Sequence, residues 1–124
     1  MARLVLIVED SETCAETLQI ALESIDGVEV RISRSPRDVF ETLVESGDEI
    51  AAVVTDLHMP RNDGFELIRR LRAEPRFREL PILLISGDSD PGLPAQALKQ
   101  GADAFFAKPY SPAAVRRKLE QLLC

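Results

Sequence analysis

Apolar residues gather in five short runs that recur at fairly even intervals along the chain. The runs are Leu4 to Val8, Val28 to Ile32, Ile50 to Val54, Ile82 to Ile85 and Ala104 to Ala107. Each run has the length of a β-strand. Four are almost continuously hydrophobic, which is typical of parallel strands covered on both faces, whereas residues 28–32 alternate and favour an edge strand. The pattern therefore predicts a parallel sheet with its second strand at an edge.

The segments between these runs carry apolar residues three or four positions apart, which is the spacing of one helix face. The first three faces are Ala15, Leu18, Leu22 and Ile25; Val39, Phe40, Leu43 and Val44; and Leu67, Ile68 and Leu71. A fourth helix is predicted from near Pro94 to Gly101. A fifth begins at Pro112, where Ser111 can cap free backbone amides, and continues to Leu123.

Five strand and helix units in a row define an α/β fold, a single doubly wound five-stranded parallel sheet with helices on both faces and right-handed crossovers. At this size the flavodoxin-like (βα)5 strand order 2-1-3-4-5 is the natural arrangement. The first and third strands are then neighbours, and a crevice opens at their carboxyl ends, where such folds bind ligands. We therefore look for function at that edge of the sheet.

Composition narrows the class of protein without changing the fold. The chain has 124 residues, of which 45% are hydrophobic and 29% charged, and this fits one folded domain spanning residues 1–124. The net charge of -6 disfavours direct binding to nucleic acid or to an anionic membrane. No apolar run is long enough for a membrane span and no signal-peptide pattern follows Met1, so a cytoplasmic location is expected. The arginines between residues 69 and 78 are interpreted as a solvated helix face, because acidic residues surround them.

Polar residues follow four of the five runs. They are Glu9 and Asp10 after the first, Asp56 after the third, Ser86 after the fourth and Lys108 after the fifth. Taken singly, each has a simpler explanation, since loops are polar and Asp10 can cap a helix. Together they place three carboxylates in one site, where two like charges 4 Å apart repel by about 4 kcal/mol at an effective dielectric constant near 20. Lys108 and a divalent cation, Mg²⁺ or Mn²⁺, would supply the countercharge.

These residues form a pattern that resembles the response-regulator receiver domains of two-component signalling, chemotaxis regulators included. The resemblance covers essentially the whole chain. Its motifs are Glu9-Asp10, Asp56-Leu57-His58-Met59-Pro60 with Asp63-Gly64 behind it, Ser86-Gly87 and Lys108-Pro109. Two positions depart from the family pattern: Glu9 stands where aspartate is commoner, and Phe105 stands where tyrosine is often found.

The resemblance implies a signalling switch rather than an enzyme that turns over an external substrate. Asp56 would accept a phosphoryl group from a sensor histidine kinase or a phosphotransfer protein. Mg²⁺ would be held by Glu9, Asp10, Asp56 and the backbone carbonyl of His58. Lys108 would pair with the phosphoryl group.

The resemblance also implies how the signal leaves the site. Ser86 would donate its hydroxyl to a phosphoryl oxygen, and Phe105 would rotate into the vacated space. The face formed by the fourth helix, the fifth strand and the fifth helix would then change, and a downstream protein, a fused output domain or a second copy would bind one state. That face carries Lys99, Phe105, Arg116 and Arg117. The chain is either a stand-alone regulator or the receiver of a longer protein, and no output domain is expected within it.

Loop residues around the site have more modest expected roles. The side chain of His58 is expected to tune water access to the phosphorylated site, together with Asp88, and not to act as a base, because no orienting acid is adjacent in the sequence. Gly64 is expected to permit unusual backbone dihedral angles, and Pro60 to shape its loop. The resemblance further implies a cis peptide bond before Pro109.

Three other functions compete with that of a receiver. A haloacid-dehalogenase-type phosphatase needs Asp-x-Asp after its first strand, whereas Asp56-Leu57-His58 follows the third. A dinucleotide-binding module needs Gly-x-Gly-x-x-Gly after Val8, and that motif is missing. A receiver-like docking module that is not phosphorylated stays open as the alternative. The residues that argue against it are Asp10, Asp56, Ser86 and Lys108.

Overall fold

The computed structural model of the protein describes residues 3–46, 49–59 and 62–123. Its elements in chain order are β1 (Arg3–Val8), α1 (Glu12–Glu23), β2 (Val28–Ser33), α2 (Pro36–Ser46), β3 (Ile50–Asp56), β4 (His58–Met59), β5 (Asn62–Asp63), α3 (Gly64–Ala73), the short 3-10 helix η2 (Pro75–Phe77), β6 (Ile82–Ser86), α4 (Leu93–Gln100), β7 (Ala104–Ala107) and α5 (Pro112–Leu123).

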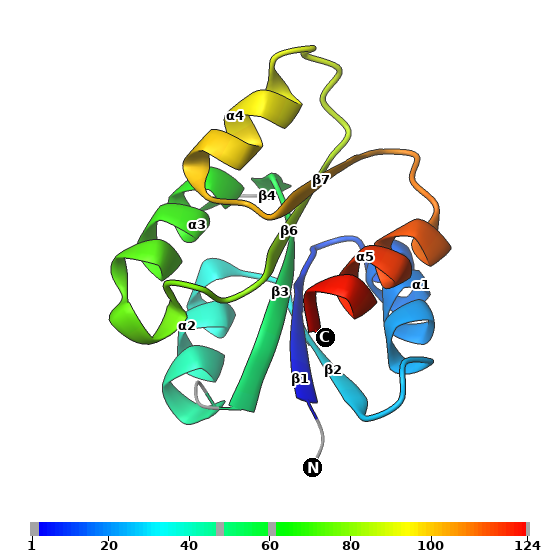
Figure 1. The fold of residues 1–124 in the computed structure, drawn as a ribbon, viewed down its shortest axis with the longest axis vertical. Helices are drawn as coiled ribbons and strands as arrows, with labels where there is room; N and C mark the ends of the chain where they lie inside the picture. The colour runs from blue at the N-terminus through cyan, green and yellow to red at the C-terminus, as the bar shows by residue number, and fades with distance from the viewer. Residues whose placement is uncertain (1–2, 47–48, 60–61, 124) are drawn as a thin grey trace.

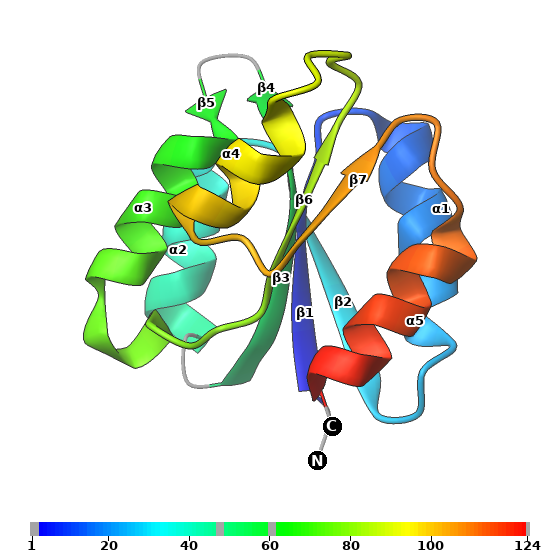
Figure 2. The same cartoon turned by 45° about the horizontal axis from the view of Figure 1, so that its top comes forward.

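Within the described residues, one five-stranded parallel sheet has the order β2-β1-β3-β6-β7. Counted along the chain, these strands give the predicted order 2-1-3-4-5. The edge position of β2, whose burial changes from residue to residue, is also confirmed. Figures 1 and 2 show α2, α3 and α4 on one face of the sheet and α1 and α5 on the other. The chain therefore has the doubly wound, flavodoxin-like fold that its pattern predicts.

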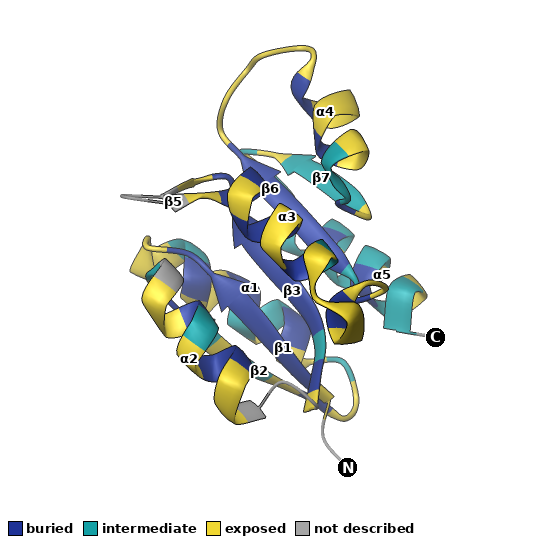
Figure 3. Cartoon of the chain, turned by 90° about the vertical axis from the view of Figure 1, so that its left-hand side faces the viewer, coloured by how far each residue is buried: buried dark blue, intermediate teal, exposed yellow. Residues whose placement is uncertain are grey.

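Each face of the sheet has its own hydrophobic core, because successive side chains of a strand point to opposite faces. In β1, Leu4, Leu6 and Val8 join the cluster beneath α2, α3 and α4, whereas Val5 and Ile7 join the cluster beneath α1 and α5. This double burial explains why β1, β3 and β6 are almost entirely apolar (Figure 3).

The last strand, β7, is not buried on both faces as β1, β3 and β6 are. Its first three residues are only half-buried and its fourth is exposed. It forms the second edge of the sheet, beside β6. The prediction that this strand is covered on both faces is therefore wrong, because an edge strand lacks a neighbour and the helices on either side cover it only in part.

The first two helices lie where the pattern predicts, with two differences. α1 ends at Glu23, so Ile25 lies in the following turn, although it still packs against the core. Val44 is 78% exposed, so α2 buries a narrower face than predicted. None of the helices in the described ranges is long and apolar enough to cross a membrane.

The last two helices begin and end at or within one residue of the positions that the sequence predicts. α4 begins at Leu93, one residue before the predicted start at Pro94, and ends just before Gly101, whose φ of 115° closes the helix. α5 begins at Pro112 as predicted. The hydroxyl of Ser111 accepts a hydrogen bond from a backbone amide of the first turn at 3.3 Å.

Arg72 contradicts the expected solvated arginine face. Its side chain is only 20% exposed. Nη1 donates to three backbone carbonyls between residues 77 and 80, at 2.7 to 3.1 Å. Nε and Nη2 both donate to the carbonyl of Gly101, and Nη2 also reaches Oδ2 of Asp103 at 3.1 Å. One guanidinium therefore ties α3 to the turn before β6 and to the turn between α4 and β7.

The loop after β3 contains a two-residue antiparallel hairpin, β4 with β5, which no apolar pattern predicted. His58 is opposite Asp63 in this hairpin. Pro60, the expected loop-shaping residue, lies outside the described residues. At the start of α3, the amide of Gly64 donates to the carbonyl of Leu57 at 2.8 Å, so α3 begins directly beside the end of β3.

Candidate functional site

The predicted site residues meet at the carboxyl ends of the strands. Glu9 follows β1, Asp56 ends β3, Ser86 ends β6 and Lys108 follows β7. Backbone hydrogen bonds continue the sheet beyond two of these ends: the amide of Glu9 donates to the Ser33 carbonyl at 3.0 Å, and that of Lys108 to the Ser86 carbonyl at 2.8 Å. The sheet itself therefore sets the spacing of the charged side chains.

Three carboxylates form the acidic cluster, defined here as Glu9, Asp10 and Asp56. One oxygen from each lies within 4.8 Å of the other two. Glu9 and Asp56 are buried, while Asp10 is exposed to solvent. An all-oxygen donor set with an open side suits Mg²⁺, which keeps several waters and leaves positions for phosphate oxygens. The residues present therefore fit the cation that the sequence predicts.

Lys108 is positioned as the countercharge of this cluster. Its Nζ lies 2.9 Å from Oδ2 of Asp56 and 3.2 Å from Oε1 of Glu9. Burial lowers the pKa of Lys108, but the contacts with Asp56 and Glu9 outweigh that effect and raise the pKa above its ordinary value. The ammonium group is thus charged throughout the physiological range and bridges two of the three acids.

Glu9 is the carboxylate whose ionisation is most disturbed. Burial, together with the neighbouring Asp56 carboxylate, raises the pKa of Glu9 to about 7, against the opposing effect of Lys108. A buried carboxylate beside a like charge favours its protonated form. Without a further cation this raised pKa favours the protonated form of Glu9, and metal binding would favour the carboxylate.

The loop after β3 contacts Asp56 through its backbone. The amide of His58 lies 3.3 Å from Oδ1 of Asp56, so the two carboxylate oxygens have different partners. The imidazole Nε2 of His58 lies 3.4 Å from Oδ2 of Asp88, in the loop after β6. No orienting acid is adjacent to this histidine in the sequence, and Asp88 comes beside it only in the fold.

Ser86 is fully buried, and its hydroxyl accepts a hydrogen bond from the amide of Asp88 at 3.0 Å. Oδ1 of Asp88 accepts from the amide of Asp90, and Oδ1 of Asp90 accepts from that of Gly92, each at 2.9 Å. Such side-chain to backbone bonds shape loops that lack regular structure. The conformation of the β6–α4 loop is therefore linked directly to the Ser86 hydroxyl.

Gly64 begins α3, and the expectation that it needs unusual dihedral angles is wrong. Among the described glycines, a positive φ occurs at Gly27 and Gly101. The requirement at Gly64 is space: a Cβ atom there would lie 2.8 Å from the carbonyl oxygen of Asp56 and 2.9 Å from Cα of Leu57. The start of α3 thus packs directly against the backbone of the predicted phosphoacceptor.

We expect Gly64→Ala to lower the free energy of unfolding by about 1 to 3 kcal/mol, because the added methyl group must displace backbone atoms. Urea denaturation followed by circular dichroism measures this change. Gly87→Ala is the matched control, since the nearest atoms to its Cβ lie at an ordinary 3.8 Å. The control should stay within about 0.5 kcal/mol of the unaltered protein. Equal losses in both variants would contradict the close-contact explanation.

The remaining predicted residues lie on β7 and just after it. The peptide bond between Lys108 and Pro109 is cis, as the resemblance implied. Phe105 is half-buried and packs against the core cluster beneath α3 and α4, whereas Phe106 packs on the opposite face of the sheet. Phe105 therefore lies on the side of the sheet where α4 is found, as a switch residue acting on that helix requires.

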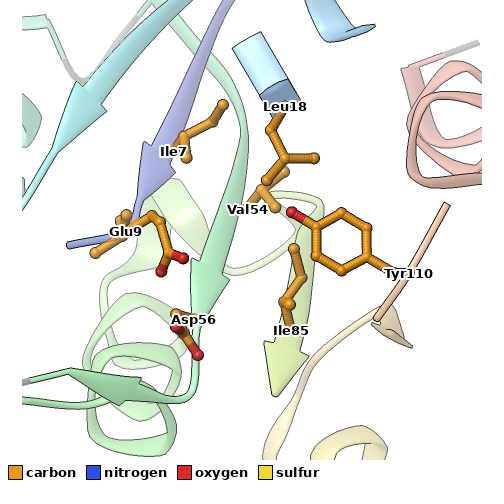
Figure 4. Close-up of a pocket in the computed structure, with 8 residues that line it drawn as sticks. Ile7, Glu9, Leu18, Val54, Asp56, Ile85 and Tyr110 are labelled. Atoms are coloured by element: carbon orange, nitrogen blue, oxygen red, sulfur yellow. The ribbon is translucent and has the colours of Figure 1, made fainter. Parts of the chain in front are cut away.

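Sequence reasoning overlooked Tyr110, the only tyrosine of the chain. It lines a small pocket beneath the acidic cluster, together with Glu9 and Asp56 (Figure 4). The remaining walls are apolar and consist of Ile7, Val8, Leu18, Val54 and Ile85. Its position two residues after Lys108 is the one signal that could have drawn attention to it.

Comparison with known proteins agrees with this geometry. The family model of the response regulator receiver domain matches residues 5–120. Chemotaxis protein CheY1 of Helicobacter pylori (strain J99) is 30% identical over 118 residues, which are 95% of this chain and 94% of that protein. The chain therefore belongs to the response-regulator receiver domain family of two-component signalling. Receiver domains of this kind bind Mg²⁺ in an acidic pocket and interact with histidine kinases and with output or target proteins.

Solved structures support the same family. The receiver domain of a signal transduction histidine kinase from Syntrophus aciditrophicus is 34% identical, with a TM-score of 0.85 over 98% of this chain and 90% of that one. A putative response regulator from Chloroflexus aurantiacus is 28% identical, with a TM-score of 0.88 over 99% of this chain and 98% of that one.

Proposed function

We propose that this receiver domain is a phosphorylation-dependent signalling switch that accepts a phosphoryl group on Asp56. The observation that carries the proposal is the 2.9 Å contact between Asp56 and Lys108 inside the acidic cluster. A buried carboxylate with one fixed cation beside it, and oxygen ligands for a second, is arranged to receive an anionic group. The donor would be a phosphohistidine on a sensor histidine kinase or a phosphotransfer protein.

In the transfer, a carboxylate oxygen of Asp56 attacks phosphorus and forms an O–P bond. The P–N bond of the phosphohistidine breaks, and its electron pair returns to the imidazole nitrogen. The amide of His58 orients the carboxylate by donating to Oδ1. Lys108, now shared between two acids, then pairs with the phosphoryl oxygens, where a compact ammonium group gives a strong charge-assisted hydrogen bond.

The carboxylates of Glu9, Asp10 and Asp56, with the backbone carbonyl of His58, would hold Mg²⁺, for which Mn²⁺ is a chemical substitute. When bound, the cation supplies charge neutralisation for the phosphoryl oxygens. Glu9 preserves the negative charge of the more usual aspartate, and its longer side chain still reaches Lys108.

Access of water to the phosphorylated Asp56 would be limited by His58 and Asp88. These side chains come from the two loops that flank the site, and their 3.4 Å contact joins one loop to the other. Because hydrolysis of an acyl phosphate needs a water molecule in line with the O–P bond, a closed pair lengthens the lifetime of the phosphorylated state.

The signal would leave the site through Ser86 and Phe105. Ser86 exchanges its contact with the Asp88 amide for a phosphoryl oxygen, which moves the β6–α4 loop. Phe105 turns into the space that this movement opens beside α4. The face made of α4, β7 and α5 then differs between the two states, and a downstream protein, a fused output domain or a second copy selects one of them.

Incubation with acetyl phosphate and Mg²⁺, followed by measurement of the intact mass, tests the proposed function. We expect the mass to increase by one phosphoryl group and to stay unchanged with EDTA, because the carboxylates of the acidic cluster repel an anionic donor. Added Mn²⁺ should restore the reaction. A protein that gains no mass at saturating Mg²⁺ would instead support the docking module that is not phosphorylated.

We expect Ser86→Ala to uncouple phosphorylation from the distant face. Phosphorylation of the unaltered protein should shift backbone NMR resonances across residues 86–117, and most of those shifts should be lost in Ser86→Ala protein phosphorylated on Asp56. Ser89→Ala, an exposed serine of the same loop, is the matched control and should keep them. Identical shifts in Ser86→Ala and unaltered protein would contradict the proposed coupling.

A further inference from the structure

The pocket beneath the acidic cluster is small, only partly open to solvent, and polar on one side. About 10 Å³ of it is open to the centre of a water molecule, which is close to the space that one buried water needs. Five of its lining residues are apolar, and the polar ones are Glu9, Asp56 and Tyr110 (Figure 4). A purely apolar cavity of this size stays empty, whereas polar walls can hold a water molecule.

Glu9 presents an oxygen that its other contacts do not satisfy. Oε1 is 3.2 Å from Nζ of Lys108, whereas Oε2 is buried and has no hydrogen-bond partner among the described residues. The side chain of Glu9 is only 5% exposed, so bulk water does not reach it. Buried carboxylate oxygens without a donor are rare in folded proteins, and internal water is their usual partner.

Tyr110 supplies a donor on another wall of the same pocket. Figure 4 shows its hydroxyl end turned inward beside Val54, on the side of the ring that faces Glu9. Burial, followed by the negative charges around it, raises the pKa of Tyr110 to about 12. The hydroxyl therefore keeps its proton at physiological pH and is available as a hydrogen-bond donor.

We propose that one water molecule in this pocket links Tyr110 to Glu9, and that Tyr110 is thereby a positioning residue for the Glu9 carboxylate. The water accepts a hydrogen bond from the tyrosine hydroxyl and donates one to Oε2 of Glu9. Because this water holds Oε2 on the pocket side, the Glu9 carboxylate cannot rotate freely. Its other oxygen, Oε1, then stays on the side of Asp10 and Asp56. The inference rests on the proposed function, because it assigns Glu9 to the Mg²⁺ site.

The water-mediated link between Tyr110 and Glu9 depends on the length of the Glu9 side chain. Aspartate has one methylene group fewer, so its carboxylate at this position would withdraw from the pocket and lose the water-mediated link. Partners that orient a metal ligand from behind commonly change metal affinity by 10- to 100-fold when removed. The effect of the tyrosine hydroxyl should therefore be seen with glutamate at position 9 and vanish with aspartate.

Calorimetric titration with Mg²⁺ alone tests this in four proteins: unaltered, Tyr110→Phe, Glu9→Asp and the double variant. We expect Tyr110→Phe to weaken Mg²⁺ binding by about tenfold in the Glu9 protein and by less than twofold in the Glu9→Asp protein. Tyr110→Phe removes one oxygen atom and leaves the ring, so loss of packing does not explain such a difference. Equal losses in both backgrounds, or no loss in either, would overturn the inference.

Two further results separate this inference from the proposed function. Val54→Ile fills the pocket from another wall without removing the hydroxyl, and it should weaken Mg²⁺ binding as Tyr110→Phe does. A crystal structure of the Mg²⁺-loaded protein should show water bonded to both Tyr110 and Glu9, and an empty pocket would overturn the link while leaving the metal site intact. If the unaltered protein fails to bind Mg²⁺, the proposed metal site fails, and the role of Tyr110 fails with it.

Discussion

We expect the Asp56→Asn protein to gain no phosphoryl group from acetyl phosphate, under conditions in which the unaltered protein gains one. Asparagine has nearly the same shape, but its amide lacks the negative charge and nucleophilic oxygen that form the O–P bond. Intact-mass measurement, with and without EDTA, detects the difference directly. Since Lys108 also contacts Glu9, it keeps one partner in this variant, and we expect the protein to remain folded.

The matched control for that experiment is Asp26→Asn, an exposed aspartate in the turn between α1 and β2. It should be phosphorylated like the unaltered protein, because the substitution is chemically the same but distant from the acidic cluster. Undiminished single phosphorylation of Asp56→Asn would contradict the assignment of Asp56. Loss of phosphorylation in both variants would show that the assay reports something other than the site.

The second large expected effect concerns stability: Arg72→Ala should lower the free energy of unfolding by roughly 2 to 4 kcal/mol. The guanidinium satisfies backbone carbonyls in two turns, at residues 77–80 and at Gly101, and contacts Asp103. Removing it leaves several partly buried acceptors without a donor, which is more harmful than losing an exposed ion pair. A fall in melting temperature of roughly 10 °C should accompany the change.

Arg69→Ala is the matched control for Arg72. It comes from the same helix and its Nη1 contacts Gln100 at 3.2 Å, but the contact is exposed to solvent. Its removal should change the free energy of unfolding by no more than about 0.5 kcal/mol. Comparable losses in the two variants would mean that the arginines act through net charge or helix propensity rather than through the hydrogen bonds of Arg72.

Much of the fold was predictable because hydrophobic periodicity reports burial. A strand covered on both faces must be apolar at every position, as residues 4–8 are, so its run of side chains is visible without a structure. The same argument misjudged β7, because its run is apolar although the strand lies at an edge. An apolar run shows that residues can be buried, whereas the neighbours that bury them depend on the sheet order.

The site was predictable to a similar extent and for a related reason. The strands of a parallel sheet all end at one edge, so polar residues that follow them, such as Asp56 and Lys108, must converge there. Which atoms touch is a finer question. The contact of His58 with Asp88 and the burial of one Glu9 oxygen depend on loop conformations that no periodic pattern encodes.

Residue chemistry and spacing along the chain thus determined the doubly wound sheet and the set of acids with their lysine, and the motifs carried the resemblance to the receiver family. Only the tertiary structure decided that Gly64 is needed for space rather than for a dihedral angle, that Arg72 binds two distant turns, and that Tyr110 lies below the acidic cluster. The physical reason is that local propensity and burial act on neighbours in sequence. Close contact between side chains is set by how separate elements pack, and it appears only once the chain has folded.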